Sequence, residues 1–364
     1  MEVLAALNRI LIFGGDNVEV VDCCDRIEAL IADPTFVPSD VPLAALADAT
    51  QVLANDGSKN VSLAKALCGL LSACCVGDSP TTKSYLLKEC RIVEVVDGML
   101  QGIGTTIPAA PLSTPTVTLA FHVLDLVATL SYNSGELRSA MRPVVAQVPR
   151  VLSCVLTSLC LLSTAQGLPA KYTRGAGASV DNGIVTVTGV SGDTQRSIRA
   201  HVDALFGAVT TATLLCVGDA SNGAALLTQG CFTTILILYK ALLPPTPPSM
   251  RRPTTSTTPT APTLGNLVSS SFPRQALADD NKKTMMQWCE QALRNLTLAA
   301  VSTLQKVAIT ALPPTLEAAV DMASGGDGAS SPSTFGQMGD NVDLDALKWT
   351  LQQTYRTATK KATA

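Results

Sequence analysis

One pattern of residues occurs three times along the chain and limits the possible fold more than any other feature. Each copy has an apolar stretch ending in Leu or Cys, a polar turn, a short second stretch and then another apolar stretch. The copies lie at residues 71–96, 126–148 and 211–236. Apolar residues between Val61 and Cys74 recur at three- and four-residue spacing, which places them on one face of an α-helix. The sequence therefore predicts an all-α fold made of repeated helical units.

The composition is typical of thin, closely packed helical layers. Apolar residues make up 47% of the 364 residues, whereas aromatic residues make up 4% and charged residues 15%. This much apolar side chain excludes a disordered chain. The formal net charge of -3 provides no excess of positive charge for a phosphate backbone, so we expect no nucleic-acid partner.

The copy from Leu126 to Met141 resembles the armadillo repeat. The family pattern runs Ala-Leu-x-Asn-Leu-Ser, then an Asn/Pro turn, a short helix ending in Ala-Gly-Gly, and a Leu-rich helix. Further matches are Ala292-Leu-Arg-Asn-Leu-Thr297 and Leu227-Thr-Gln-Gly230. Within the best copy the matching positions are Leu130, Ser131, Asn133, Glu136, Arg138 and Met141. The resemblance implies a right-handed α-solenoid of armadillo-like three-helix repeats with long inter-repeat loop insertions.

We expect one solenoid over residues 1–364. Its predicted parts, in chain order, are degenerate N-terminal capping helices at 1–60, the clearest repeats at 61–243 with loop insertions at 101–115 and 164–195, a Pro/Thr-rich loop at 244–275, C-terminal repeat helices at 276–322, a flexible loop at 323–341 and a C-terminal helix at 342–364. Alternation over Ile184–Thr188 indicates a short strand or hairpin inside the second insertion.

The resemblance also implies where a ligand binds. In armadillo proteins the third helices line a concave groove, and an asparagine near each third-helix end holds the backbone of an extended peptide. The equivalent groove-lining candidates here are Cys74, Thr129, Leu214 and Asn295. Only Asn295 keeps the amide, and Cys or Leu cannot supply its paired donor and acceptor. A general peptide-reading groove of the nuclear-import type is therefore disfavoured.

The residues of enzyme chemistry are few. Of the two histidines, His122 lies three residues before Asp125 on a helical pattern, and His201 is expected in the first turn of a helix. The sequence has no Gly-x-Ser-x-Gly turn and no phosphate-binding loop. The cysteines, eleven in all, lack metal-ligand spacing and lie mostly in apolar runs, which indicates buried, reduced thiols. We predict no enzyme activity, no cofactor, no metal and no small-molecule substrate.

Two uncharged stretches raise the alternative of a membrane protein. Val151–Ala165 is shorter than the roughly 20 residues that span a bilayer, and the repeat pattern divides Ala220–Tyr239 into two helices at Gly230. Buried solenoid helices are the favoured interpretation. The first ten residues lack the basic region of a signal peptide, so the expected location is the cytoplasm, with association to the cytoskeleton or another large assembly open.

An elongated stack exposes more surface per residue than a globule, yet charged residues are fewer here than the usual ~25%. We therefore expect part of the surface to be covered by other proteins. The predicted function is a non-catalytic scaffold or adaptor, a constitutive subunit of a larger assembly that docks partners through solenoid faces and loop insertions. A regulator of a GTPase or kinase and a membrane-associated helical protein remain as alternatives.

Overall fold

The computed structural model describes residues 17–76, 80–104, 107–167, 180–181, 184–185, 191–243 and 263–306. Within these residues the fold is all-α, apart from one small hairpin. The helices are α2 (Asn17–Ala32), η1 (Pro38–Asp40), α3 (Leu43–Asp56), α4 (Val61–Cys75), α5 (Pro80–Lys88), α6 (Ile92–Gly104), α7 (Thr114–Ser131), α8 (Gly135–Ala140), α9 (Arg142–Val145), α10 (Val148–Ala165), α11 (Gly192–Cys216), α12 (Ala220–Thr228), α13 (Cys231–Leu242), α14 (Leu264–Ser271), η3 (Arg274–Ala276) and α15 (Asp279–Lys306).

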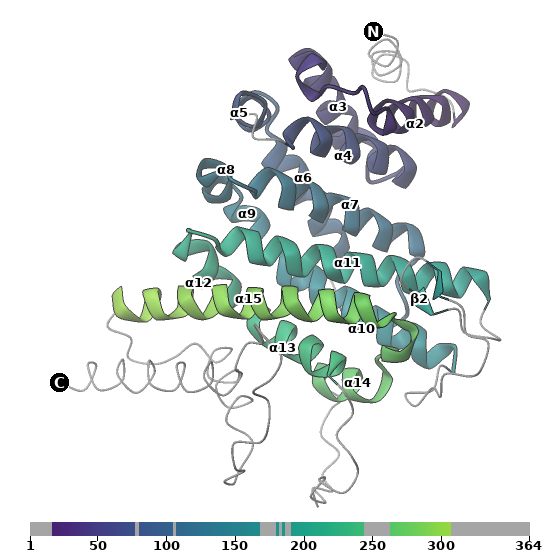
Figure 1. Ribbon diagram of the computed structural model, residues 1–364, viewed down its shortest axis with the longest axis vertical. Helices are drawn as coiled ribbons and strands as arrows, with labels where there is room; N and C mark the ends of the chain where they lie inside the picture. The colour runs from purple at the N-terminus through teal and green to yellow at the C-terminus, as the bar shows by residue number, and fades with distance from the viewer. Residues whose placement is uncertain are drawn as a thin grey trace, which may run out of the picture.

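Five helices lie one below another along the long axis of the molecule in Figure 1, and we call them the front layer. They are α2, α4, α7, α11 and α15, and each contacts the next. A close approach joins α7 to α11, because a Cβ at Gly207 would lie 3.3 Å from the Phe121 ring. Apolar residues of successive helices therefore form one continuous core rather than separate cores.

A second set of helices covers the other side of this core, and we call it the back layer. It consists of α3, α6, α10 and α13, which contact one another in that order. The short helices α5, α8 and α12 lie at one edge, on the left of Figure 1, between the end of a front helix and the start of the next back helix. The order front helix, edge helix, back helix thus recurs along the described chain.

The turns after α7 and α11 have similar geometry. Asn133 and Gly218 both adopt left-handed φ values, of 53° and 71°. The next residues, Ser134 and Asp219, are both extended and accept a hydrogen bond from the first turn of the edge helix. Asn and Gly tolerate the left-handed region and Ser and Asp are favoured N-caps, so the sequence encodes this corner directly.

Buried hydrogen bonds join neighbouring helices, both within the front layer and between the two layers. The Thr211 hydroxyl donates to the Leu124 carbonyl oxygen at 2.9 Å, joining α11 to α7. The Tyr239 hydroxyl donates to Glu290 Oε1 at 2.9 Å, joining α13 to α15. Each bond satisfies a group that would otherwise be buried without a partner, so each favours one relative placement of its helices.

Several predicted boundaries differ from those observed. The first insertion is shorter than 101–115, because α6 continues to Gly104 and α7 begins at Thr114, capped by Ser113. The second ends before Gln195, because α11 begins at Gly192. Inside it, Val180–Asp181 (β1) pairs antiparallel with Ile184–Val185 (β2). Residues 168–179, 182–183 and 186–190 of this insertion are outside the described residues.

The predicted loop at 244–275 contains a helix that we did not expect. α14 begins after Thr263, whose hydroxyl accepts a hydrogen bond from Asn266 N–H, and it packs against α10 and α13 through Val268. The 3₁₀ turn η3 follows. The predicted loop at 323–341 and the predicted helix at 342–364 are outside the described residues, as is the section from 307 to 322.

Ten of the eleven cysteines are buried free thiols, which confirms the prediction that they pack in the core. Burial raises the pKa of Cys68, Cys75 and Cys160 to about 12. A thiol that stays protonated is neither a nucleophile nor a metal ligand. Among the described residues no group of His, Cys, Asp or Glu could hold a metal ion.

Candidate functional site

The front layer presents a surface whose side chains touch from one helix to the next. At the top, Lys65 of α4 pairs with Glu28 of α2 at 2.9 Å. Farther down, the rings of Phe206 on α11 and Trp288 on α15 meet edge to face with centroids 6.1 Å apart. All four side chains are partly or fully exposed, so side chains on this surface meet where α2 adjoins α4 and where α11 adjoins α15.

Three of the four groove-lining candidates lie in a row on this surface. Thr129 on α7, Leu214 on α11 and Asn295 on α15 are all half-buried. Thr129 and Leu214 each stand two residues before the last residue of their helix. The structure therefore places Thr129 and Leu214 at corresponding points of α7 and α11, and Asn295, inside α15, lies beside the end of α11 through its bond to Thr213.

Cys74 does not belong to this row. Its side chain is buried on α4, and the residue two positions before the end of that helix is the half-buried Ala73. The sequence alignment was wrong by one residue here, because it matched Cys74 by residue pattern and not by the helix end. We call Ala73, Thr129, Leu214 and Asn295 the inner row.

The amide of Asn295 is already engaged inside the molecule. Its Nδ2 donates to the Thr213 carbonyl oxygen at 3.1 Å, and its Oδ1 accepts from Gln291 Nε2 at 3.0 Å. The Thr213 carbonyl lies in the last turn of α11, where Val217 N–H bonds to Leu214 instead. Asn295 thus satisfies a helix-end carbonyl and fixes α15 to α11.

Three residues beyond the inner row lies a second row, which the sequence analysis missed. Val76, Tyr132, Val217 and Leu298 are large apolar side chains that are 64%, 57%, 43% and 66% exposed. The first three are the C-cap residues of α4, α7 and α11. We call these four residues the apolar row. The available signal in the sequence was a Val or Tyr directly before the Gly or Asn that follows each apolar stretch, at Gly77, Asn133 and Gly218.

Two cations lie beside Tyr132 without a carboxylate partner among the described residues. Lys83 of α5 is 4% exposed, and its ammonium donates to the Tyr132 carbonyl oxygen at 2.6 Å. Arg138 of α8 donates from Nη1 to the Ser131 carbonyl oxygen at 3.2 Å, while its Nε is buried with no partner. Lys83 and Ser134 help to line a cavity of about 280 Å³ at this edge. Both cations stabilise the carbonyl end of α7, and Glu136, which pairs with Lys88, also lines the cavity.

His122 and Asp125 do not form the pair that their spacing suggested, since no hydrogen bond joins these two described residues. Burial, and then the nearby charge of Lys65, lowers the pKa of His122 to about 4. Burial raises the pKa of Asp125. Burial therefore disfavours the charged form of both groups. This agrees with a structural role and not with proton transfer.

Ser158 and His201 have the geometry of a nucleophile and its base. Leu112 N–H donates to Ser158 Oγ, and Ser158 Oγ lies 2.7 Å from His201 Nε2. His201 Nδ1 lies 2.7 Å from the Ser197 carbonyl oxygen, so Nδ1 carries the proton and Nε2 accepts from Ser158. Both side chains are completely buried, and His201 lies in the third turn of α11, not the first as expected. No substrate reaches this pair, which instead anchors the segment before α7.

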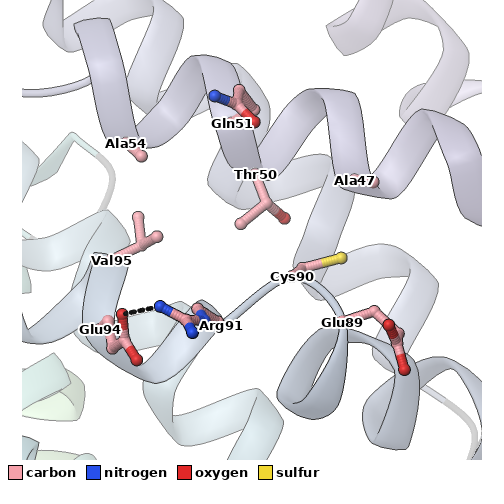
Figure 2. A pocket seen from close by; sticks show the side chains of 9 residues that line it. All are labelled: Ala47, Thr50, Gln51, Ala54, Glu89, Cys90, Arg91, Glu94 and Val95. Atoms are coloured by element: carbon pink, nitrogen blue, oxygen red, sulfur yellow. Dashed lines mark ion pairs between the residues drawn. The ribbon is translucent and has the colours of Figure 1, made fainter.

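A second cavity, of about 300 Å³, lies between α3 and the turn from α5 to α6 (Figure 2). Thr50 and Cys90 line it, and Arg91 and Glu94 form an ion pair of 3.5 Å at its side. Cys90 is half-buried, but burial raises its pKa, and its interaction with the Thr50 side chain only partly offsets this. The thiol is therefore not an activated nucleophile.

By length and composition, two described helical segments are apolar enough to cross a membrane, Thr114–Ser131 and Arg142–Ala165. A third would be added if Ala220–Thr228 and Cys231–Leu242 were one span, but these two helices meet at 73°. The division at Gly230 is thus confirmed. The first two segments are 56% and 78% buried inside the protein, where their apolar side chains form the core between the layers.

Comparison with known proteins found no match to this chain among protein-family models, curated proteins or solved structures.

Proposed function

We propose that this protein is a non-catalytic interaction scaffold, built as a right-handed α-solenoid of armadillo-like repeats. The recurring order of front, edge and back helices and the equal turns at Asn133 and Gly218 support this repeat type. Each unit is too thin to bury its own apolar side chains, and its neighbours complete the core.

The single observation that carries the proposed function is the apolar row. Exposed apolar residues occur singly on most proteins, but here the C-cap residues of three successive front helices are exposed and apolar, and Leu298 on the next front helix is exposed too. Together the two rows form a strip. The half-buried side chains of the inner row lie beside the exposed side chains of the apolar row. A partner that lies along the strip would bury several of them at once, as a stable subunit interface requires.

The scaffold proposal is tested by placing a photo-reactive amino acid at one of two surface positions of the full-length protein in its native cells. The probe is p-benzoylphenylalanine at Tyr132, and the matched position outside the apolar row is Val21 of α2, which is 55% exposed. The protein captured from Tyr132 is identified, purified and mixed with the full-length chain to measure its dissociation constant.

We expect the double variant Tyr132→Ser/Val217→Ser to weaken this binding at least tenfold, because aromatic and aliphatic anchors dominate interface energies. The control Val21→Ser/Ile107→Ser removes side chains that are 55% and 75% exposed elsewhere and should leave binding unchanged. Equal weakening by both double variants, or no protein captured from Tyr132 in any extract, would contradict the proposed function.

A further inference from the structure

We infer that the C-terminal segment of this chain, residues 342–356, docks on the apolar row of the same molecule and covers it when no partner is bound. This inference uses the surface assigned above, and it makes that surface self-regulated. It rests on four observations: where the described chain ends, how much chain follows, the pattern of its residues, and the charges beside Tyr132.

The described chain ends at the edge that carries the apolar row. α15 runs in the same direction as α7 and α11 in Figure 1, and its last turns lie at the edge formed by α8 and α12. Leu298, the lowest member of the apolar row, belongs to α15 itself. The remaining 58 residues of the chain therefore begin beside the row.

The length of the remaining chain suits the row. Helices pack about 8–10 Å apart, so three steps from α15 to α4 span about 27 Å. The 35 residues from 307 to 341 have an end-to-end distance of about 30–35 Å as a flexible chain. A helix over the 15 residues 342–356 would be about 22 Å long. The segment can thus reach the row and lie along three successive members of it, which span about 18 Å.

The sequence of the segment has one apolar side. Leu344, Leu347, Leu351 and Tyr355 follow a spacing of three, four and four residues, which places them on one face of a helix. Such a helix cannot bury this face by itself, and an exposed apolar row at the right distance provides a surface for it.

The charges at the start of the segment also match those beside Tyr132. Asp343 and Asp345 flank the first leucine of the segment. Lys83 and Arg138, beside Tyr132, bind only backbone carbonyl oxygens among the described residues. A carboxylate at the edge of the apolar row would give each cation an opposite charge. We therefore expect the acidic start of the segment to lie at Tyr132.

The first experiment is a photo-cross-link in the purified full-length protein. p-Benzoylphenylalanine at Tyr132 should form a link to residues 342–356 within a single molecule, as read by mass spectrometry of the monomer band. The same probe at Val21 should give no such link. The variant Leu344→Ser/Leu347→Ser/Leu351→Ser should reduce the yield at Tyr132 at least fivefold.

The second experiment supplies the segment in trans. A labelled peptide of residues 340–356 should bind the full-length triple Leu→Ser variant, as measured by fluorescence anisotropy. Adding Tyr132→Ser/Val217→Ser to that variant should weaken binding at least tenfold, whereas adding Val21→Ser/Ile107→Ser should not. Asp343→Asn/Asp345→Asn in the peptide should weaken binding at least threefold.

The inference is overturned by a link from Tyr132 to the segment only in a covalent dimer, by no link to the segment, or by an equal link in the triple variant. These outcomes need no partner protein, so they are separate from the proposed function. If the link is absent while Tyr132→Ser/Val217→Ser still weakens partner binding, the scaffold stands and self-docking fails. If the link forms and no partner is affected, the scaffold fails.

Discussion

The contact between the edge helix α12 and the front helix α15 gives a sharp test of how these two helices pack. Gly223 on α12 faces Ala299 on α15, and a Cβ at position 223 would collide with the Ala299 Cβ. Overpacking a core costs about 1–3 kcal/mol, and this collision belongs at the upper end. Replacing Gly by Ala inside a helix contributes about 1 kcal/mol in the opposite direction. Gly223→Ala should therefore destabilise the protein by about 2 kcal/mol.

The reverse exchange on α15 should remove the collision. Ala299→Gly alone costs about 1 kcal/mol of helix propensity and about 0.8 kcal/mol for the lost methyl burial. In Gly223→Ala/Ala299→Gly the methyl group only changes side, so the total cost should be below about 1 kcal/mol. The singles add to about 4 kcal/mol, and the coupling between the two sites is then about 3 kcal/mol.

Urea unfolding of the full-length chain measures this coupling. A Trp349→Phe background leaves Trp288 of α15 as the single tryptophan, and far-ultraviolet circular dichroism reports the helices. Costs of the two single variants that add within about 0.5 kcal/mol would refute the placement of α12 against α15.

Three further predictions concern single polar groups. Lys83→Met should cost about 2 kcal/mol in urea unfolding, because the buried ammonium caps α7, whereas Lys88→Met, in an exposed pair with Glu136, should cost under about 1 kcal/mol; equal costs would contradict the cap. Thr211→Val should cost about 1 kcal/mol by removing the bond to the α7 carbonyl, and an unchanged urea midpoint would argue against that bond. The folded pKa of His122, about 4, lies below the unfolded value of about 6.5, so its contribution to the free energy of unfolding is complete above pH 6.5 and decreases as the pH falls toward 4. His122→Gln should reduce this loss of stability between pH 7 and pH 4.5. An identical pH profile of the variant would contradict the lowered pKa.

The helical class and most helix positions could be predicted from the sequence because the signals are local. The three- and four-residue spacing from Val61 to Cys74 predicts α4, and Gly230, with its left-handed φ of 78°, divides α12 from α13 as predicted. Both features depend only on side chains within one or two turns of each other.

Other features depend on contacts between distant residues, and the sequence analysis missed or misplaced them. α14 has only eight residues and follows a Pro/Thr-rich stretch, so its stability comes from packing on α10 and α13. The inner-row position on α4 was misplaced to Cys74 because a one-residue shift keeps the apolar pattern but changes which side chain is buried. Similarly, Tyr132 reads as one more apolar residue of a helix, and only the turn at Asn133 leaves it exposed.

The central claim is that the front helices α4, α7, α11 and α15 stack in succession, so that the four residues of the apolar row follow one another along the stack. It is tested most directly by electron-paramagnetic distance measurements between pairs of genetically encoded spin labels at the apolar row of the full-length protein. With about 9 Å for each helix-to-helix step, Val76 to Val217 and Tyr132 to Leu298 should each give about 18 Å, and Val76 to Leu298 about 27 Å. A distance from Val76 to Leu298 no longer than that from Val76 to Val217 would contradict the claim, because the helices would then form a closed bundle.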